Sequence, residues 1–524
     1  MSESQAPAAP AVVPEGGLKR GDFRAIAVGG WGDGLNSYAH SMAWFQDRLY
    51  VGSARANLHL GSTREPPLQW PFYPVKCPEN LLDIDARARI RRWDPRDGTW
   101  TEVYCADLVE GLGGVRIPAE IGYRGMAVFQ GPSDDAPVLY VSSYSGYAKY
   151  RDDSRGQGPR VFRSEDGTKF QVVSAAGLGR HGISAFRSLI NYKGKLYTSP
   201  VGTAKHTPNM SPYPVVFESV DPARGEWRPV SEPGFGDPRN VAVFEMAEFN
   251  GYLYAGTGNV VAGFELWKTD ARGDPPYRWK RILRLGAFRG NLSEGAISLC
   301  VFKDALYVGT AIQDGGYDRE YEIGPSPGEV IRVFPDDTWE IVAGSPRLTP
   351  EGVRTPLSGL RPGFNNFFNG YIWRMCVHDG WLYVGTFDWS TYLRYFDVNN
   401  WPGQVRDFVL QLGIEETIET EGGCDLVRTF DGQRWFCVTR TGFDNPYNTG
   451  IRTMVSTPHG LAVGTVNPFG PEVAVRRGGE WGYVDNARGG LEVWLGLAGT
   501  APATEEPVDD EIIGYGMQGV DDTG

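Results

Sequence analysis

YIWRMCVHDGWLYVGTFDW, residues Tyr371–Trp389, decides the fold. It contains an apolar run, a tight turn at Asp379-Gly380 and an aromatic-rich run through Gly385. Asp-Gly between alternating apolar residues is a strong hairpin signal, because a primed turn needs positive φ at both central residues. The stretch therefore predicts a β-hairpin.

The same hairpin pattern recurs along the chain at irregular intervals. If Met375 is position 0, Tyr383 lies at +8 and Gly385 at +10. Six further copies keep this pattern with small changes, and one of them is stretched by the loop GPSDDAP; their origins are Met42, Met126, Leu189, Met246, Leu299 and Met454. Internal self-similarity of this kind indicates a repeat protein.

Each repeat continues into a second hairpin. RIRRWDPRDGTWTEV from Arg89 and DLVRTFDGQRWFCV from Asp425 are examples of an alternating strand, an Asp/Gly turn and another alternating strand. Two hairpins give four strands per unit, and four-stranded antiparallel sheets repeated radially form a propeller. We therefore predict an all-β chain that forms a seven-bladed β-propeller.

The two ends of the repeat region predict how the ring closes. GLEVW (Gly490–Trp494) matches GFELW (Gly263–Trp267), the third strand of the fourth blade, but no good fourth strand follows it. We expect DFRAIAVGG (Asp22–Gly30) to close the ring as the outer strand of the last blade. The propeller would then span residues 22–497, between a disordered lead (1–21) and an acidic disordered tail (498–524). The tail contains a small group of apolar residues at 512–517, so the alternative is that it acts as a docking peptide.

Composition limits the classes of partner that the protein is expected to bind. The charge of −13 and pI near 5.1 argue against nucleic acid or an anionic membrane as the main partner. No apolar run is long enough to cross a membrane, and the N-terminus lacks a signal-peptide pattern, so a cytoplasmic location is expected. The six cysteines follow no CxxC spacing and are expected to be reduced; a Cys424–Cys437 disulfide is the alternative.

The loops that lead into four of the blades share a second signature. Relative to the repeat origin, Phe or Trp lies at −11, Asp or Asn at −9 and Asn at −6, as in Phe235, Asp237 and Asn240. The structural interpretation is that the polar side chains hydrogen-bond the backbone of a sharp turn while the aromatic ring fills the blade interface. The alternative is a ring of ligand-binding amides at one mouth of the channel.

Three insertions follow second strands, at residues 58–78, 313–327 and 390–423. Second-to-third and fourth-to-first loops share one face of a propeller, so we expect the insertions to gather there. Val405, Phe408, Val409 and Leu412 have helical spacing and predict a short amphipathic helix. This helix is either a lid over the channel mouth or a stability patch.

Residues just before each repeat origin should face the channel. They are His40, Arg124, Arg187, Glu245, Ser298, Arg374 and Arg452. Buried arginines need a partner, so this ring is either satisfied by the protein's own carbonyls and carboxylates or forms a pocket for an anionic or aromatic small molecule. Aromatic walls beside it are predicted from Trp373, Trp389, Tyr392 and Tyr144, with Arg187 and His40 as further substrate contacts.

Catalytic candidates are few. Arg124, Arg374 and Arg452 would stabilise negative charge, and Glu245 or Asp388 would act as the base. The sequence has no HExxH, nucleophile elbow, P-loop or dinucleotide fingerprint in a fitting context. No metal site and no cofactor are predicted, and a structural calcium or another cation in the channel is left open.

The segments GFELWKTD, GLEVWLG, LYVGT and GIRTM resemble a broad group of bacterial kelch-like propellers with a Gly-x-Glu-Leu-Trp blade motif. The resemblance covers Asp22 to Gly496 and implies the fold rather than a function. GIRTM and GTVNPFG are also similar to the propeller part of cylindrocyclophane-type alkylating enzymes, which join an alkyl halide to a resorcinol carbon or, in relatives, to a carboxylate. Those enzymes carry an N-terminal calcium-binding domain, whereas a short lead precedes the propeller here, so no catalytic residue is carried over.

The leading hypothesis from the sequence is an enzyme of bacterial specialised metabolism. It would bind an aromatic or anionic substrate at the channel mouth and perform a reaction such as alkyl or aryl transfer. The alternative is a non-catalytic propeller that docks a protein partner through its decorated face or its acidic tail.

Overall fold

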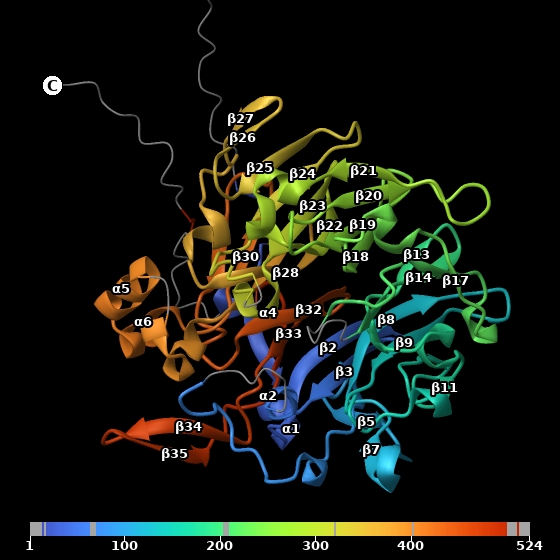
Figure 1. The fold of residues 1–524 in the computed structure, drawn as a ribbon, viewed down its shortest axis with the longest axis horizontal. Coiled ribbons are helices and arrows are strands. Elements are labelled where there is room, and N and C mark those ends of the chain that lie inside the picture. The colour runs from blue at the N-terminus through green and yellow to red at the C-terminus, as the bar shows by residue number, and fades with distance from the viewer. Residues whose placement is uncertain are drawn as a thin grey trace, which may run out of the picture.

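The computed structural model describes residues 13–14, 17–62, 70–202, 209–318, 321–400, 403–499 and 511–512. These residues are mostly strands and irregular segments with few helices, so the chain is all-β (Figure 1). The strands pair antiparallel in successive groups that follow the predicted repeats.

Each group contains four consecutive strand positions. The first strands are β2 (Asn36–Phe45), β8 (Gly122–Phe129), β12 (Ile183–Phe186) with β13 (Ile190–Tyr192), β18 (Ala242–Phe249), β22 (Gly295–Phe302), β28 (Asn369–His378) and β32 (Gly450–Thr457). The second strands are β3 (Arg48–Arg55), β9 (Val138–Tyr144), β14 (Lys195–Thr198) with β15 (Pro200–Gly202), β19 (Tyr252–Gly258), β23 (Ala305–Ala311), β29 (Trp381–Asp388) and β33 (Gly460–Val466).

The outer strands are shorter. The third strands are β4 (Arg89–Trp93), β10 (Val161–Ser164), β16 (Phe217–Ser219), β20 (Leu266–Thr269), β24 (Val330–Val333), β30 (Leu426–Thr429) and β36 (Val493–Gly496). The fourth strands are β5 (Trp100–Cys105), β11 (Gln171–Val172), β17 (Arg228–Pro229), β21 (Lys280–Leu283), β25 (Trp339–Ala343), β31 (Phe436–Thr439) and β1 (Phe23–Ala27).

Short hairpins and helices decorate these groups. The hairpins are β6 (Leu108–Glu110) with β7 (Arg116–Pro118), β26 (Arg347–Thr349) with β27 (Gly352–Arg354), and β34 (Glu472–Arg477) with β35 (Glu480–Asp485). The α-helical segments are α1 (Gly29–Gly32), α2 (Asn57–Gly61), α3 (Leu285–Phe288), α4 (Gln313–Gly316), α5 (Gly403–Leu412) and α6 (Ile414–Glu421).

The groups are joined through their first strands. These strands contact one another in the order β2, β8, β13, β18, β22, β28 and β32, and β32 contacts β2 again. Hydroxyl side chains reinforce the joints: Ser41 donates to the Tyr123 carbonyl at 2.6 Å, and Ser298 donates to the Ile372 carbonyl, also at 2.6 Å. The contacts between first strands therefore form a continuous series in which each group adjoins the next.

The N-terminal strand lies at the outer edge of the group that contains the last repeat. β1 pairs antiparallel with β36, with Phe23 opposite Gly496. The residues just before it differ from the predicted disordered lead. Leu18 is buried, and its N–H donates to the Tyr383 hydroxyl at 2.7 Å. Leu18 fills the junction between two groups. The low-complexity sequence around Leu18 gives no indication of this burial.

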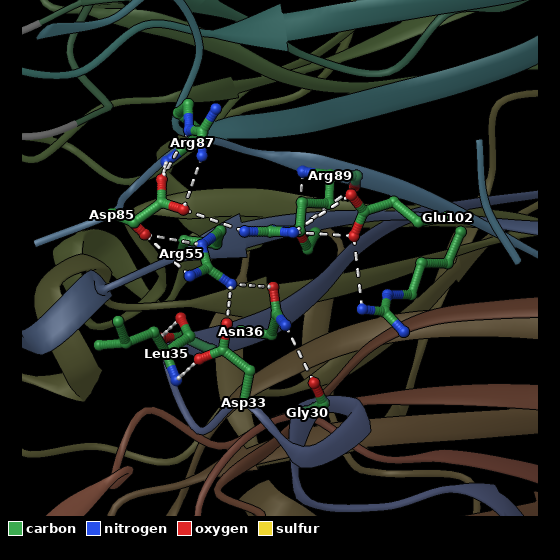
Figure 2. A network of polar contacts seen from close by, with 12 residues as sticks. Gly30, Asp33, Leu35, Asn36, Arg55, Asp85, Arg87, Arg89 and Glu102 are labelled. Carbon is green, nitrogen blue, oxygen red and sulfur yellow. Dashed lines mark hydrogen bonds and ion pairs between the residues drawn. The ribbon is translucent and has the colours of Figure 1, made fainter. Parts of the chain in front are cut away.

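The incoming loops confirm the structural interpretation of the second signature. Asn36, Asn240, Asn369 and Asn448 each donate through Nδ2 to the carbonyl six residues earlier, at 2.9 Å. The aromatic residue of each loop has positive φ, as at Phe235 (φ 57°). Figure 2 shows the loop of the first group, where Arg55 donates to Asn36 and Asp33 at 2.8 and 2.7 Å.

The same contacts explain the Gly-x-Glu-Leu-Trp motif. Glu265 accepts hydrogen bonds from Asn240 at 2.8 Å and from Trp267 Nε1 at 3.0 Å, and Phe235 stacks on Trp267 with 5.2 Å between ring centroids. Glu492 is used in the same way by Asn448 and Trp494. The motif therefore ties an incoming loop to the third strand of its own group.

The predicted helix in the 390–423 insertion is present as α5, and α6 follows it (Figure 1). Val409 and Ile418 are buried in a cluster with Trp389, whereas Leu412 is exposed. The side chains of Val405 and Phe408 lie outside the described ones. The insertion that begins at Leu58 reaches the same region, because Leu58 and Val75 share a buried cluster with Tyr395. Val75 also bridges Val473 in the β34–β35 hairpin. These decorations pack on one another rather than standing apart.

Candidate functional site

In the first strands, the residue two positions before the repeat origin lies in a β-bulge. The pairing of β28 with β29 shifts between Ile372 and Arg374, which leaves Trp373 out of the ladder. The same shift occurs in β2, β8, β18, β22 and β32, and the remaining first strand is interrupted there, between β12 and β13. A bulge re-aims one side chain. We call these residues the central set: His40, Arg124, Arg187, Phe244, Ile297, Trp373 and Arg452.

The central set converges and has two chemically different halves. Phe244 and Ile297 share an apolar cluster that Trp373 packs against. Trp373 also lies 6.3 Å from the ring of Tyr38, which comes from a group that is not its neighbour in the order above. The polar half comes from four neighbouring groups: Arg452, His40, Arg124 and Arg187. The other three groups supply the apolar half.

Arg187 is a buried arginine with two donor atoms that no described residue satisfies. The residue is 9% exposed, and its Nε and Nη2 atoms are buried and make no hydrogen bond within the described residues. Its guanidinium instead lies 4.3 Å from the centre of the Phe244 ring. A buried guanidinium normally requires carboxylates or carbonyls to compensate its lost hydration. Within the described residues, Nε and Nη2 of Arg187 therefore lack this compensation.

The other two arginines of the central set contact an aromatic ring and an amide, respectively. Arg452 lies 5.7 Å from the centre of the Trp373 ring. Arg124 donates through Nη2 to Asn209 Oδ1 at 2.9 Å, while its buried Nε has no partner within the described residues. Asn209 in turn donates to Gln313 Oε1 of α4 at 3.3 Å. Two connections that follow second strands thus position Arg124.

Burial and mutual repulsion weaken the basicity of this half. Desolvation, followed by the charges of Arg124 and Arg374, lowers the pKa of Arg452 to about 9. Desolvation lowers the pKa of Arg124 to about 10. The pKa of His40 is held well below its usual value by burial and then by the three arginine charges. His40 is therefore a neutral imidazole within a cationic cluster, and an entering anion would relieve the repulsion.

Glu245 is the carboxylate at this cluster. It forms an ion pair with Arg374 at 3.3 Å and accepts a hydrogen bond from Ser188 at 2.9 Å. Its charge attracts Arg124, Arg187 and Arg452, so one negative charge faces four positive ones within the described residues. Glu245 is 7% exposed. The predicted base and the predicted arginines are therefore brought together, and positive charge remains in excess.

The bulges change which residues meet at the centre. Glu245, Ser298 and Arg374 were expected to be equivalent to His40 and Arg452, but they lie one residue later in their strands. The equivalent residues are Phe244, Ile297 and Trp373, of which only Trp373 was predicted. A constant spacing of two residues before the repeat origin would have identified all three. Ser298 donates to a neighbouring carbonyl and contributes to the joint between groups.

The remaining predicted residues are divided between the site and its surroundings. Tyr144 contacts the His40 ring, with centroids 6.1 Å apart. Tyr392 packs against Phe387, itself in contact with Trp373. Trp389 lies in the same buried cluster as Phe387, against which Trp373 and Tyr392 also pack, together with Val409 and Ile418 of the 390–423 insertion. Tyr38 and Asn209 belong to the site but carried no signal in the repeat pattern.

Asp388 lies in an incoming-loop network rather than with the arginines. It is fully buried, and its Oδ1 accepts hydrogen bonds from the N–H and hydroxyl of Ser390, while Oδ2 accepts one from Asn366 at 3.3 Å. Burial raises the pKa of Asp388 well above its ordinary value, and the nearby charge of Asp425 raises it further. The bonds to Ser390 and Asn366 give Asp388 a structural role.

Metal and membrane signals are absent from the part of the chain described above. No group of three or more His, Cys, Asp or Glu residues in it has a metal-binding arrangement. All six cysteines are free thiols, including Cys424 and Cys437. None of the described helices is long and apolar enough to cross a membrane.

The chain matches no family model and no curated protein. Comparison with solved structures finds likenesses at low sequence identity. A puromycin hydrolase is 12% identical with a TM-score of 0.41, over 94% of this chain and 57% of that one. The polysaccharide lyase Uly1 is 11% identical with a TM-score of 0.44, over 88% and 90%. A puromycin-hydrolyzing peptidase of Mycobacterium tuberculosis is 10% identical with a TM-score of 0.35, over 86% and 61%. The chain thus spans little more than half of the puromycin hydrolase.

Proposed function

We propose that the chain is a seven-bladed β-propeller, closed by β1 as the outer strand of its last blade, and that it is a small-molecule enzyme. Its substrate carries an anionic group and an aromatic or apolar body and binds at the central set. The observation that carries this proposal is Arg187, whose buried Nε and Nη2 have no partner within the described residues.

The two halves of the central set specify how such a substrate would lie. The anionic group accepts hydrogen bonds from Arg187 and Arg124, since a guanidinium matches a carboxylate or phosphate with two parallel donors. The body of the substrate then extends toward Phe244, Ile297 and Trp373. A molecule with both parts satisfies the arginines and keeps the apolar half dry.

Glu245 is the proposed base. Arg374 and Ser188 hold its carboxylate in place, at 3.3 and 2.9 Å. It takes a proton from the substrate, and the negative charge that develops on the substrate is stabilised by Arg124 and Arg452. The oxygen or carbon nucleophile formed in this way would attack an alkyl halide, so that the new bond to the alkyl carbon forms as the carbon–halogen bond breaks and the halide leaves. This step suits the alkyl transfer of bacterial specialised metabolism that the family resemblance implies.

Calorimetric titration with a small panel tests the binding step. Benzoate and phenyl phosphate carry both required parts, acetate lacks the body, and benzyl alcohol lacks the charge. We expect the first two to bind best, and Arg187→Met to weaken them at least tenfold with an unchanged melting temperature. The matched control is Arg272→Met, because the Arg272 side chain is 82% exposed. The proposal would be refuted if all four compounds bound with equal affinity, or if Arg187→Met bound benzoate and phenyl phosphate as tightly as Arg272→Met.

A further inference from the structure

The two described residues of the C-terminal segment lie along the outer edge of β31. Glu511 forms an antiparallel bridge with Phe436, and the N–H of Ile512 donates to the Trp435 carbonyl at 2.8 Å. β31 is the fourth strand of its group, so this edge is the one that no other strand of the group covers. An extended segment that hydrogen-bonds to a sheet edge is a known mode of peptide recognition.

Side chains give this contact chemical specificity. Arg434 donates to Glu511 through Nε at 3.1 Å and through Nη2 at 2.8 Å, which is a bidentate pair. The Arg434 guanidinium also lies 5.5 Å from the centre of the Phe436 ring, so its orientation is fixed by packing. Ile512 is half-buried against the core cluster that contains Trp435. The edge therefore recognises an acidic residue followed by a branched apolar one.

The chain can reach this edge within one molecule. Gly499 follows β36, and eleven residues separate it from Glu511. An extended chain of this length spans at most about 40 Å. β31 and β36 belong to adjoining groups: Phe436 and Val438 share a core cluster with Leu461, against which Trp494 of β36 also packs. The departure point and the acceptor edge are thus neighbours.

We propose that the outer edge of β31, with Arg434 and Trp435, is a strand-docking site for an acidic-aliphatic segment, and that the chain's own C-terminal segment occupies it in cis. Exposed sheet edges invite pairing with other chains. Occupancy by Glu511 and Ile512 closes this edge to a second copy. The inference is independent of the proposed enzyme activity, because the docking site is built from different residues.

The first test uses hydrogen–deuterium exchange on the full chain. We expect the amide of Ile512 to be protected in the wild type and to exchange at least tenfold faster in Arg434→Gln. Arg272→Gln is the control and should leave the exchange unchanged. Unprotected exchange at Ile512 in the wild type would overturn the proposal.

The second test asks whether the site can be filled from outside. A fluorescent peptide of residues 507–517, PVDDEIIGYGM, is titrated into the full chain and into the full-length double variant Glu511→Arg/Ile512→Asp. We expect anisotropy to report binding to the double variant at least tenfold tighter than to the wild type. Equal binding to both, or no binding to either, would refute cis occupancy, as would a wild-type dimer that the double variant converts to monomer.

Discussion

Asp388 lies directly opposite Asn369 in the pairing of β28 with β29, where other groups place a hydrogen-bond donor. Arg55 donates to Asn36 Oδ1 at 2.8 Å, Asn259 to Asn240 Oδ1 at 3.0 Å, and Asn467 to Asn448 Oδ1 at 3.2 Å. An ionised carboxylate cannot donate. Within the described residues, Asn369 Oδ1 is buried without a partner.

Replacing this carboxyl group by an amide should stabilise the protein. Asp388→Asn supplies the donor that Asn259 and Asn467 provide elsewhere, but it gives up the 3.3 Å bond that Oδ2 accepts from Asn366, so we expect a net gain of about 1 kcal/mol in the free energy of unfolding at neutral pH. Urea denaturation at fixed temperature measures it. A loss of stability would mean that the carboxylate itself is required.

The same substitution should flatten the pH dependence of stability. Burial raises the folded-state pKa of Asp388, and it raises that of Asp425 to about 7. These two carboxyl groups therefore hold more protons in the folded protein than in the unfolded chain, and their contribution to stability falls as pH rises from about 4 to about 7. Asp388→Asn removes one of the two groups and the like charge beside the other. Unfolding curves between pH 4 and pH 8 with an unchanged slope would contradict this account.

The incoming loops should be sensitive to loss of their asparagine. Asn240→Ala removes the bonds to the Gly234 carbonyl and to Glu265 and leaves both acceptors buried, so we expect a loss of about 2–4 kcal/mol. Asn191→Ala is the control, since Asn191 is exposed in β13 and should cost less than about 0.5 kcal/mol. Equal effects of the two substitutions in urea denaturation would contradict the structural role.

Glu245→Gln separates binding from catalysis. Removing the carboxylate leaves four arginines without their shared partner, so benzoate should bind about three- to tenfold more tightly, and less so at high salt. Turnover of a substrate that needs the base should fall by about 10²–10⁴-fold. Calorimetry at two ionic strengths checks the first expectation. Weaker anion binding would show that Glu245 itself contacts the ligand.

Trp373→Leu tests the apolar half of the central set. Loss of the indole should weaken an aromatic acid such as benzoate by about 1–2 kcal/mol, while acetate, which does not reach this half, should be affected little. The ratio of the two affinities is the readout, because a general loss of folding would lower both together. An unchanged ratio would remove Trp373 from the site.

The regular part of this protein could be predicted from local sequence. Strand alternation, Asp-Gly turns and the spacing of Tyr383 and Gly385 depend on neighbouring residues only, and the strands follow them. The centre could not be predicted in full, because a bulge depends on how two strands pair. Because the bulged residue of β18 is Phe244 and that of β28 is Trp373, the central set contains these two residues and not Glu245 and Arg374. Burial of Leu18 and pairing of Glu511 were missed for a related reason, since both depend on partners hundreds of residues or a whole group away.

The repeated bulge also separates two demands on the sequence. Residues in the ladder must keep their alternation, because each pairs with a residue of the second strand of its own group. A bulged residue has no ladder partner, so His40, Phe244 or Arg452 can be replaced without a change of strand register. The strand pairing thus leaves the identity of these side chains open. If the proposed function holds, substitutions at these positions change the preferred ligand one residue at a time while the architecture stays the same.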